Sequence, residues 1–209
     1  MDDYAINRSS ASLLIGLVLL IQAILTAPSG MLIGRVKLKT LIAFGWLLTA
    51  APSLSFLAPN FVTLLALRIL YAAGLSITIP ALGPLLMQWF TPKELPIVNG
   101  IGLAAGSLGV TISTFLVAPL AEIIGWKASI SIFGSVSFAG LISWVILGKV
   151  REYSEASTHL SIKEAISVLR SRTTLLMAVA DAGPFTQYVA LSAWLPTFYS
   201  EVHNISSID

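Results

Sequence analysis

The sequence predicts an all-α fold, a polytopic transmembrane helix bundle with six spans. Hydrophobic residues make up 56% of the 209 residues and charged residues only 11%, whereas soluble proteins carry about 25% charged residues. A spanning helix needs roughly 20 mostly apolar residues. Five uncharged stretches supply them: 9–34, 40–67, 69–92, 95–121 and 128–148. We therefore expect a multi-pass protein of the cell membrane.

The first five spans follow from these stretches in order, the sixth is the largely apolar segment 173–200, and each is long enough to cross a bilayer with some tilt. At about 1.5 Å rise per residue they are roughly 30 Å or longer. Prolines within or near their ends predict kinks, which lipid tolerates where other helices or a wet cavity satisfy the freed backbone groups. The predicted spans are 11–33, 39–58, 61–88, 97–119, 124–148 and 173–200.

Basic residues between the spans predict the orientation. If the turn at 34–39 is cytoplasmic, the loops near 89–96 and 149–172 are cytoplasmic too. These loops hold nine Lys and Arg residues, and the opposite side holds only Arg8 and Lys127. Because cytoplasmic loops are enriched in Lys and Arg, we expect all three loops to face the cell interior.

This orientation puts both chain ends outside, so the chain is expected to be a piece of a longer protein with a preceding span. The sequence NRSS at 7–10 recurs approximately as NISS at 204–207, which would suit the internally repeated halves of many transporters. The expected parts are most of one helix bundle (1–148), a cytoplasmic linker (149–172), and the first helix of a second bundle with an outer loop (173–209).

The linker is expected to contain a short helix. Ser161 and Glu164 fit a capping box, and Ile162, Ile166 and Leu169 then share one helical face. An amphipathic helix on the cytoplasmic surface, close to anionic lipid headgroups, is one interpretation. A solvated linker without membrane contact is the alternative.

Soluble-enzyme chemistry has no support in the sequence. His159 and His203 lie outside the spans without paired ligands at metal spacing, and cysteine is absent. No phosphate-binding G-x-x-x-x-G-K-[ST] motif is present. We expect no enzyme activity, no cofactor, no bound metal and no nucleic-acid partner.

Two charged residues, Arg68 and Asp181, lie well inside predicted spans. Such residues cost at least about 2.5 kcal/mol on insertion scales and usually face a cavity or a partner. The planar fork of Arg68 suits carboxylate-like groups, so it is expected to bind an anionic solute. Asp181 is expected to bind and release the coupling proton. The alternatives are an Arg68 bonded to backbone carbonyls near a helix end, and an Asp181 that reaches cytoplasmic water.

Polar residues near these two charges complete the expected solute-binding set. Tyr71 follows Arg68 by three residues, and Tyr188 shares a helical face with Asp181. Gln22 lies midway along the first span, where it contacts either the solute or another helix. The predicted solute-binding residues are Arg68, Tyr71, Gln22, Gln187 and Tyr188.

Several segments resemble those of the major facilitator superfamily. The family motif after its second helix runs Gly, three residues, Asp, a basic residue, any residue, Gly and two basic residues. Gly30, Arg35 and Lys39 match it, whereas Gly34 replaces the Asp, Lys37 the second Gly and Leu38 one basic residue. Similar segments are LRILYAAG (67–74), GLAAGSLG (102–109), IIGWKASISIFG (123–134) and AWLPTFYSEV (193–202).

The resemblance implies a chain that runs from the loop after helix one to the end of helix seven, about half of a typical member. It implies that the helices with Arg68 and Asp181 line a central cavity. It also implies that Gly30 and Gly34 face a helix of the other half, where small residues permit close packing. Packing within one half is the alternative. Gly102 and Gly106 are expected to serve helix packing, and Arg35 and Lys39 to serve the gate.

The leading functional hypothesis is a secondary transporter that moves a small anion by alternating access, coupled to protons as a symporter. Ser113 and Thr114 stand where antiporters of the family often carry Gly-Pro, which favours symport or uniport. One alternative is drug–proton antiport on the same fold. Another is a membrane sensor or an inactive fragment that does not transport.

Overall fold

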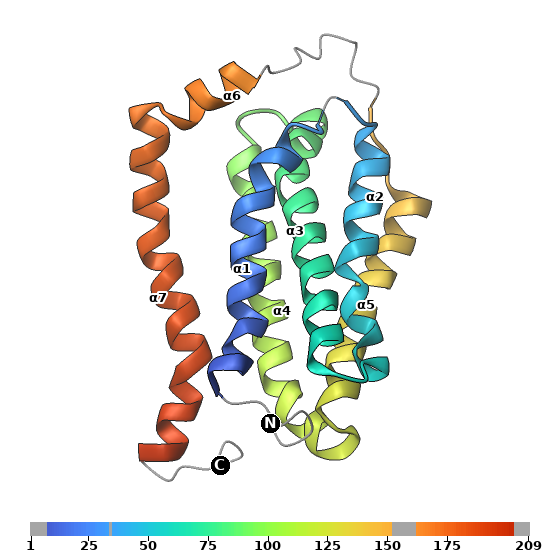
Figure 1. Ribbon diagram of the computed structural model, residues 1–209. Helices are drawn as coiled ribbons and strands as arrows, with labels where there is room; N and C mark the ends of the chain where they lie inside the picture. Colours follow the sequence, from blue (N-terminus) through green and yellow to red (C-terminus); the bar gives the residue numbers. More distant parts are fainter. Residues whose placement is uncertain (1–7, 34, 152–161, 203–209) are drawn as a thin grey trace. The chain divides into compact units, whose positions relative to one another are not determined.

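The computed structural model describes residues 8–33, 35–151 and 162–202, and its regular elements are helices, which confirms the all-α prediction (Figure 1). Gly34, Ser161, His159 and His203, discussed above, lie outside the described residues. The helices are α1 (Arg8–Gly30), α2 (Leu38–Thr49), the 3₁₀-helix η2 (Ala51–Leu57), α3 (Phe61–Trp89), α4 (Leu95–Ile124), α5 (Trp126–Leu147), α6 (Ile162–Leu169) and α7 (Arg172–Val202).

Five helical segments in the described part of the chain are long and apolar enough to cross a membrane. They coincide with the first five predicted spans and are 12–30, 38–57, 61–89, 95–124 and 126–147. The sixth predicted span corresponds to α7, a helix of 31 residues that is not among these five. Asp181 and Gln187 near the middle of α7 make it less apolar than the others. The chain is therefore a helical membrane protein.

The chain forms two compact units, residues 1–157 and 158–209. In the first unit α1 and α2 pack against α3, α5 packs against α2 and η2, and α4 packs against α5. In the second unit Ser171 caps α7, because the Thr174 N–H donates to its Oγ at 3.2 Å. The division falls inside the predicted linker, and the assignment of the two units to two halves of a larger bundle stays a prediction.

The second span changes helix type halfway, where a proline predicts a kink. The α-helix ends at Thr49, and Pro52 then stands at the start of η2. Because proline has no N–H to donate, it cannot continue the α-helical hydrogen-bond pattern. The Thr49 hydroxyl donates to the Trp46 carbonyl at 2.8 Å, which engages one carbonyl of the last α-helical turn. Thr49 and Pro52 are thereby held side by side at the break.

Many apolar side chains point outward, and several small hydroxyl residues lie inside beside a few buried aliphatic side chains. Phe115 and Ile123 on α4 are 76% and 78% exposed, whereas Ser76 and Ser129 are fully buried. Ser76 donates to the Ala72 carbonyl at 2.8 Å and Ser129 to the Gly125 carbonyl at 2.9 Å. The buried hydroxyls of Ser53 and Ser55 have no partner in the described part of the chain. In lipid, helix association relies on close packing of small residues rather than on apolar burial, and this arrangement fits that requirement.

A close helix contact in the first unit joins α2 to α3 through two glycines. A Cβ atom added at Gly74 would lie 2.6 Å from the backbone N of Thr49 and 2.7 Å from the carbonyl oxygen of Gly45. A Cβ atom at Gly45 would collide with the Thr78 hydroxyl. The two backbones therefore touch one helical turn beyond Tyr71. This contact fixes the position of α3 relative to α2.

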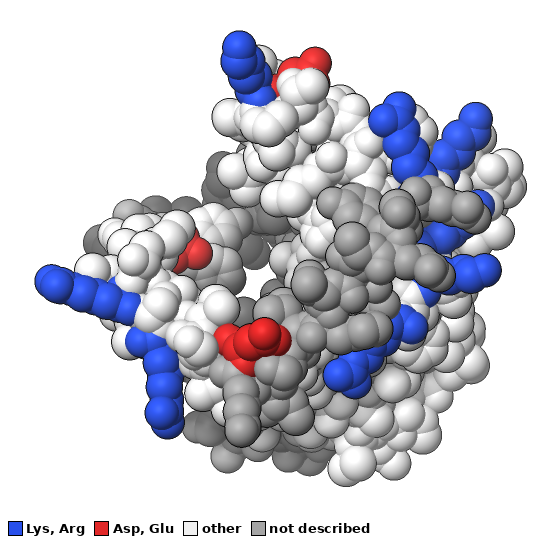
Figure 2. Space-filling view, turned by 90° about the horizontal axis from the view of Figure 1, so that it is seen from above, with Lys and Arg blue, Asp and Glu red and all other residues white. Residues whose placement is uncertain are grey.

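The described residues of the first unit that belong to the three loops predicted to be cytoplasmic lie at one end of that unit. The ends of α1, α3 and α5 that lead into them point the same way (Figure 1), and Lys and Arg side chains are visible at this end (Figure 2). The Trp89 indole N–H donates to the Lys149 carbonyl at 3.2 Å, and that of Trp144 to the Lys39 carbonyl at 3.0 Å. The Arg151 guanidinium stacks 4.5 Å from the centre of the Trp89 ring. Which side of the membrane this end faces stays a prediction.

We predict that Gly74→Ala destabilises the full-length protein by about 1–3 kcal/mol, the usual cost of overpacking a tight contact. The matched control is Gly100→Ala on α4, where no described atom lies within 4 Å of an added Cβ. That change should leave stability unchanged or raise it by up to about 1 kcal/mol through helix propensity. Thermal unfolding in detergent measures both variants, and equal stability of the two would contradict the α2–α3 contact.

Candidate solute-binding cavity

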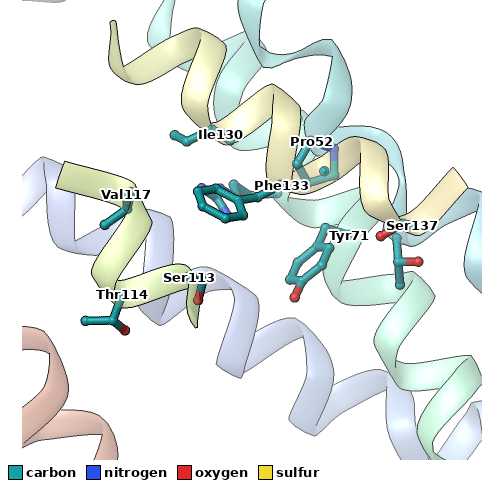
Figure 3. A pocket seen from close by; sticks show the side chains of 11 residues that line it. Pro52, Tyr71, Ser113, Thr114, Val117, Ile130, Phe133 and Ser137 are labelled. Carbon is teal, nitrogen blue, oxygen red and sulfur yellow. The ribbon is translucent and has the colours of Figure 1, made fainter. Parts of the chain in front are cut away.

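A cavity of about 370 Å³ lies inside the first unit among α2, η2, α3, α4 and α5 (Figure 3). Its apolar walls are Pro52 from η2, Val117 from α4, and Ile130 and Phe133 from α5. Its volume is at the lower end of the range of about 300–1,000 Å³ that is usual for small-molecule sites. A small molecule is the ligand that this space can enclose.

Helix α3 supplies the charged wall of the cavity. Its start is fixed by Asn60, whose Oδ1 accepts hydrogen bonds from the Thr63 N–H at 2.8 Å and the Thr63 hydroxyl at 2.9 Å. This is the usual geometry of an N-cap residue. Arg68 and Tyr71, three residues apart on one helical face, then both line the cavity.

Helix α5 supplies the opposite wall and holds η2 in place. Ser131 donates to the Lys127 carbonyl at 2.9 Å and accepts a 2.9 Å hydrogen bond from the Phe56 N–H of η2. A Cβ atom added at Gly134 would collide with the backbone N of Ser53. Direct backbone packing and one hydrogen bond therefore set the distance between Pro52 and the residues of α5 that face the cavity.

The positively charged Arg68 lies in a part of the sequence with few acidic residues. Its Nε is buried and has no hydrogen-bond partner in the described part of the chain. Between residues 9 and 121 the sequence has a single acidic residue, Glu94, in the loop before α4. The alternative interpretation was that Arg68 bonds to backbone carbonyls near a helix end. The buried Nε makes no such bond in the described part of the chain. The arrangement favours an anion as the partner of this guanidinium.

The hydroxyl groups around the cavity fall into two kinds. Ser113 and Thr114 on α4 both donate to the Val110 carbonyl at 2.9 Å, so that their oxygens are left as acceptors. Tyr71 and Ser137 also line the cavity, and neither hydroxyl has a hydrogen-bond partner among the described residues. Figure 3 shows Ser113 and Thr114 on one side and Tyr71 and Ser137 on the other.

The remaining predicted solute-binding residues do not line this cavity. Gln22 lies on α1 and is partly exposed. Asp181, Gln187 and Tyr188 lie on α7 in the second unit, where all three are exposed. Of the predicted set, the structure brings together Arg68 and Tyr71.

The predicted packing and gating residues are all open in the described part of the chain. No atom lies within 4 Å of a Cβ atom added at Gly30, Gly102 or Gly106. Arg35 and Lys39 are exposed at the loop end of the unit. Their expected roles in packing and gating therefore stay predictions.

Sequence reasoning missed the wall formed by α5. Ile130, Phe133 and Ser137 recur at helical spacing, which places them on one face. That spacing predicts a common face for the three residues. It does not tell whether this face lines a cavity with Arg68 or contacts lipid. Ser113 and Thr114 were noticed only as a departure from a family pattern, and their place on the cavity comes from the structure.

Comparison with known proteins gives matches along the whole chain. The model of the Major Facilitator Superfamily matches residues 1–209. An uncharacterised protein of Campylobacter jejuni is 25% identical over 98% of the chain and 64% of its own length. A probable L-galactonate transporter of Escherichia coli is 24% identical over 98% of the chain and 49% of its length. A nitrite extrusion protein of Bacillus subtilis is 22% identical over 99% of the chain and 52% of its length. The chain thus spans roughly half to two thirds of these relatives.

We predict that Ser131→Ala loosens η2, because the Phe56 N–H loses its acceptor. An unsatisfied buried donor costs about 1–3 kcal/mol. Ser135→Ala is the matched control on the same helix, since the Ser135 hydroxyl is exposed and bonds only to the Ile132 carbonyl. Amide hydrogen exchange in the full-length protein should speed up at Phe56 in the first variant alone. Unchanged exchange at Phe56 would show that Ser131 does not hold η2.

Proposed function

Because the chain belongs to the Major Facilitator Superfamily, we propose that the full-length protein is a multi-pass secondary transporter of the cell membrane that carries a small anion by alternating access. The observation that carries this proposal is Arg68, whose buried Nε has no partner in the described part of the chain, on the wall of a partly open cavity. Family membership alone does not choose the solute, and Arg68 supports the choice of an anion.

Charge is the main argument for an anion. A cation removed from water interacts with an opposite charge far more strongly than it would in bulk solvent, because the effective dielectric constant falls. A negatively charged solute would therefore compensate Arg68, whereas a cationic solute would be repelled. The names of two of the relatives support the choice, since L-galactonate and nitrite are both anions.

Coupling to protons is the second part of the proposal. Moving one elementary charge against a membrane potential of 100 mV costs about 2.3 kcal/mol. An anion that enters a negative-inside cell with one proton carries no net charge, so the potential no longer opposes it. Asp181, the acidic residue within the α7 span, is the residue we assign to carry this proton. Entry of the anion and the proton in the same direction, which is symport, is therefore the coupling that we propose.

Two alternatives remain distinguishable from anion symport. A drug–proton antiporter on the same fold would move organic cations or neutral compounds, which gain nothing from Arg68. A sensor or an inactive fragment would bind without net transport. Uptake into proteoliposomes that contain the full-length protein separates all three, because only the symporter accumulates an anion when the outside is acidified.

We predict that Arg68→Gln lowers anion uptake about 10- to 100-fold, because a hydrogen bond to a charged group contributes about 1.5–3 kcal/mol. Arg68→Lys should also impair uptake, since an ammonium lacks the planar fork. Initial rates in proteoliposomes measure the effect. Arg170→Gln in the exposed turn before α7 is the control and should transport normally. Wild-type uptake by Arg68→Gln would reduce Arg68 to a structural role.

We predict that Asp181→Asn abolishes the stimulation of uptake by an inward proton gradient. The amide has nearly the same shape but cannot take up a proton, so exchange of labelled for unlabelled anion should continue. The measurement compares net uptake with exchange in the same proteoliposomes. If net uptake by Asp181→Asn still follows the proton gradient, another residue carries the proton.

A further inference from the structure

We infer that the solute of this cavity is a hydroxylated organic carboxylate, of the size of a sugar acid, rather than a small inorganic oxyanion. The inference rests on the proposed function and narrows it to one chemical class. It comes from the polarity of the hydrogen-bonding groups on the two sides of the cavity and from the volume between them.

The α3–α5 side of the cavity offers donors. Arg68 contributes its positive charge to the lining, and Tyr71 and Ser137 contribute hydroxyls that can donate and have no partners in the described part of the chain. A carboxylate is an acceptor with two oxygens and about four lone-pair positions, so it can receive several such bonds at once. This side of the cavity therefore suits the charged end of the solute.

The α4 side offers acceptors. The hydroxyl hydrogens of Ser113 and Thr114 are already donated to the Val110 carbonyl at 2.9 Å. Serine and threonine in helices commonly form this bond, and it leaves lone pairs on the hydroxyl oxygen. An acceptor gains nothing from a nitrite or nitrate ion, which carries no hydrogen-bond donor. A solute hydroxyl can donate to these oxygens.

The size of the cavity also favours an organic carboxylate over a small inorganic oxyanion. Nitrite or nitrate would occupy on the order of 30–60 Å³, taking about 30 Å³ for each water-sized group, and the cavity measures about 370 Å³. Val117, Ile130 and Phe133 give it a largely apolar lining. A carbon chain can lie against these side chains while its two ends reach opposite walls, whereas a single inorganic anion would leave the α4 wall unused.

The test measures binding of named anions to the purified full-length protein by calorimetry. The probes are the aldonates D-gluconate, D-galactonate and L-galactonate, together with hexanoate, which has six carbons and no hydroxyl, and nitrate. We expect at least one aldonate to bind at least tenfold more tightly than hexanoate and nitrate. Hexanoate or nitrate binding as tightly as every aldonate would overturn the inference and leave anion transport standing. Binding of none of these anions would overturn the inference, and the uptake assay above would then decide whether another anion is transported.

A second measurement assigns the effect to the α4 hydroxyls. The double variant Ser113→Ala, Thr114→Val should weaken binding of the preferred aldonate by about threefold to tenfold for each hydrogen bond lost. Hexanoate binding should not change, and it reports whether the variant is folded. Thr111→Val is the matched control, because the Thr111 hydroxyl also bonds to its own helix, at 2.9 Å from the Ser107 carbonyl, but does not line the cavity. Equal effects on both probes, or on neither, would contradict hydroxyl recognition by α4.

Discussion

An arginine side chain inside a membrane span, in a part of the sequence with few acidic residues, is the constraint on which this molecule depends. A buried charge must be paired or hydrogen-bonded to avoid a large desolvation cost. Arg68 has no such partner at its Nε among the described residues. Arg68 also lines the cavity, and the anionic solute proposed above would supply the opposite charge there.

The rest of the first unit keeps that site in one geometry. Gly45 and Gly74 bring the backbones of α2 and α3 into contact, and Ser131 ties η2 to α5 through the Phe56 N–H. The hydroxyls of Ser76, Thr78 and Ser129 donate to carbonyls of their own helices. Rigid positioning of this kind lowers the entropic cost of binding. Local packing would thereby reduce the entropic cost of binding the proposed solute.

The positions of the spans were predictable from the sequence, because lipid imposes length and apolarity on every crossing helix. Arg68 was also predictable, since a charge within a long uncharged region is conspicuous. The cavity wall on α5 was not, because lipid-facing and cavity-facing residues of a membrane helix can be equally apolar. Phe133 faces the cavity and Phe115 is 76% exposed, although both lie within apolar stretches. The change of helix type could be predicted from Pro52 alone. That Pro52 also lines the cavity could be seen only in the structure.

The donor or acceptor role of the cavity hydroxyls also could not be predicted from the sequence. Sequence shows that Ser113, Thr114 and Ser137 are present, but their bonding to the helix backbone decides whether each one offers a donor or an acceptor. Ser113 and Thr114 share the Val110 carbonyl, and Ser137 has no partner among the described residues. Specificity within a large transporter family can therefore depend on hydrogen-bond direction as well as on residue identity.

The most direct test of the central claim is an experimental structure of the full-length protein in a lipid nanodisc, determined without solute. The account predicts that no carboxylate from any part of the complete chain lies within about 4 Å of the Arg68 guanidinium, the usual limit of an ion pair. A carboxylate bound to Arg68 in that structure would contradict the account, because the counter-charge would then belong to the protein and not to the solute.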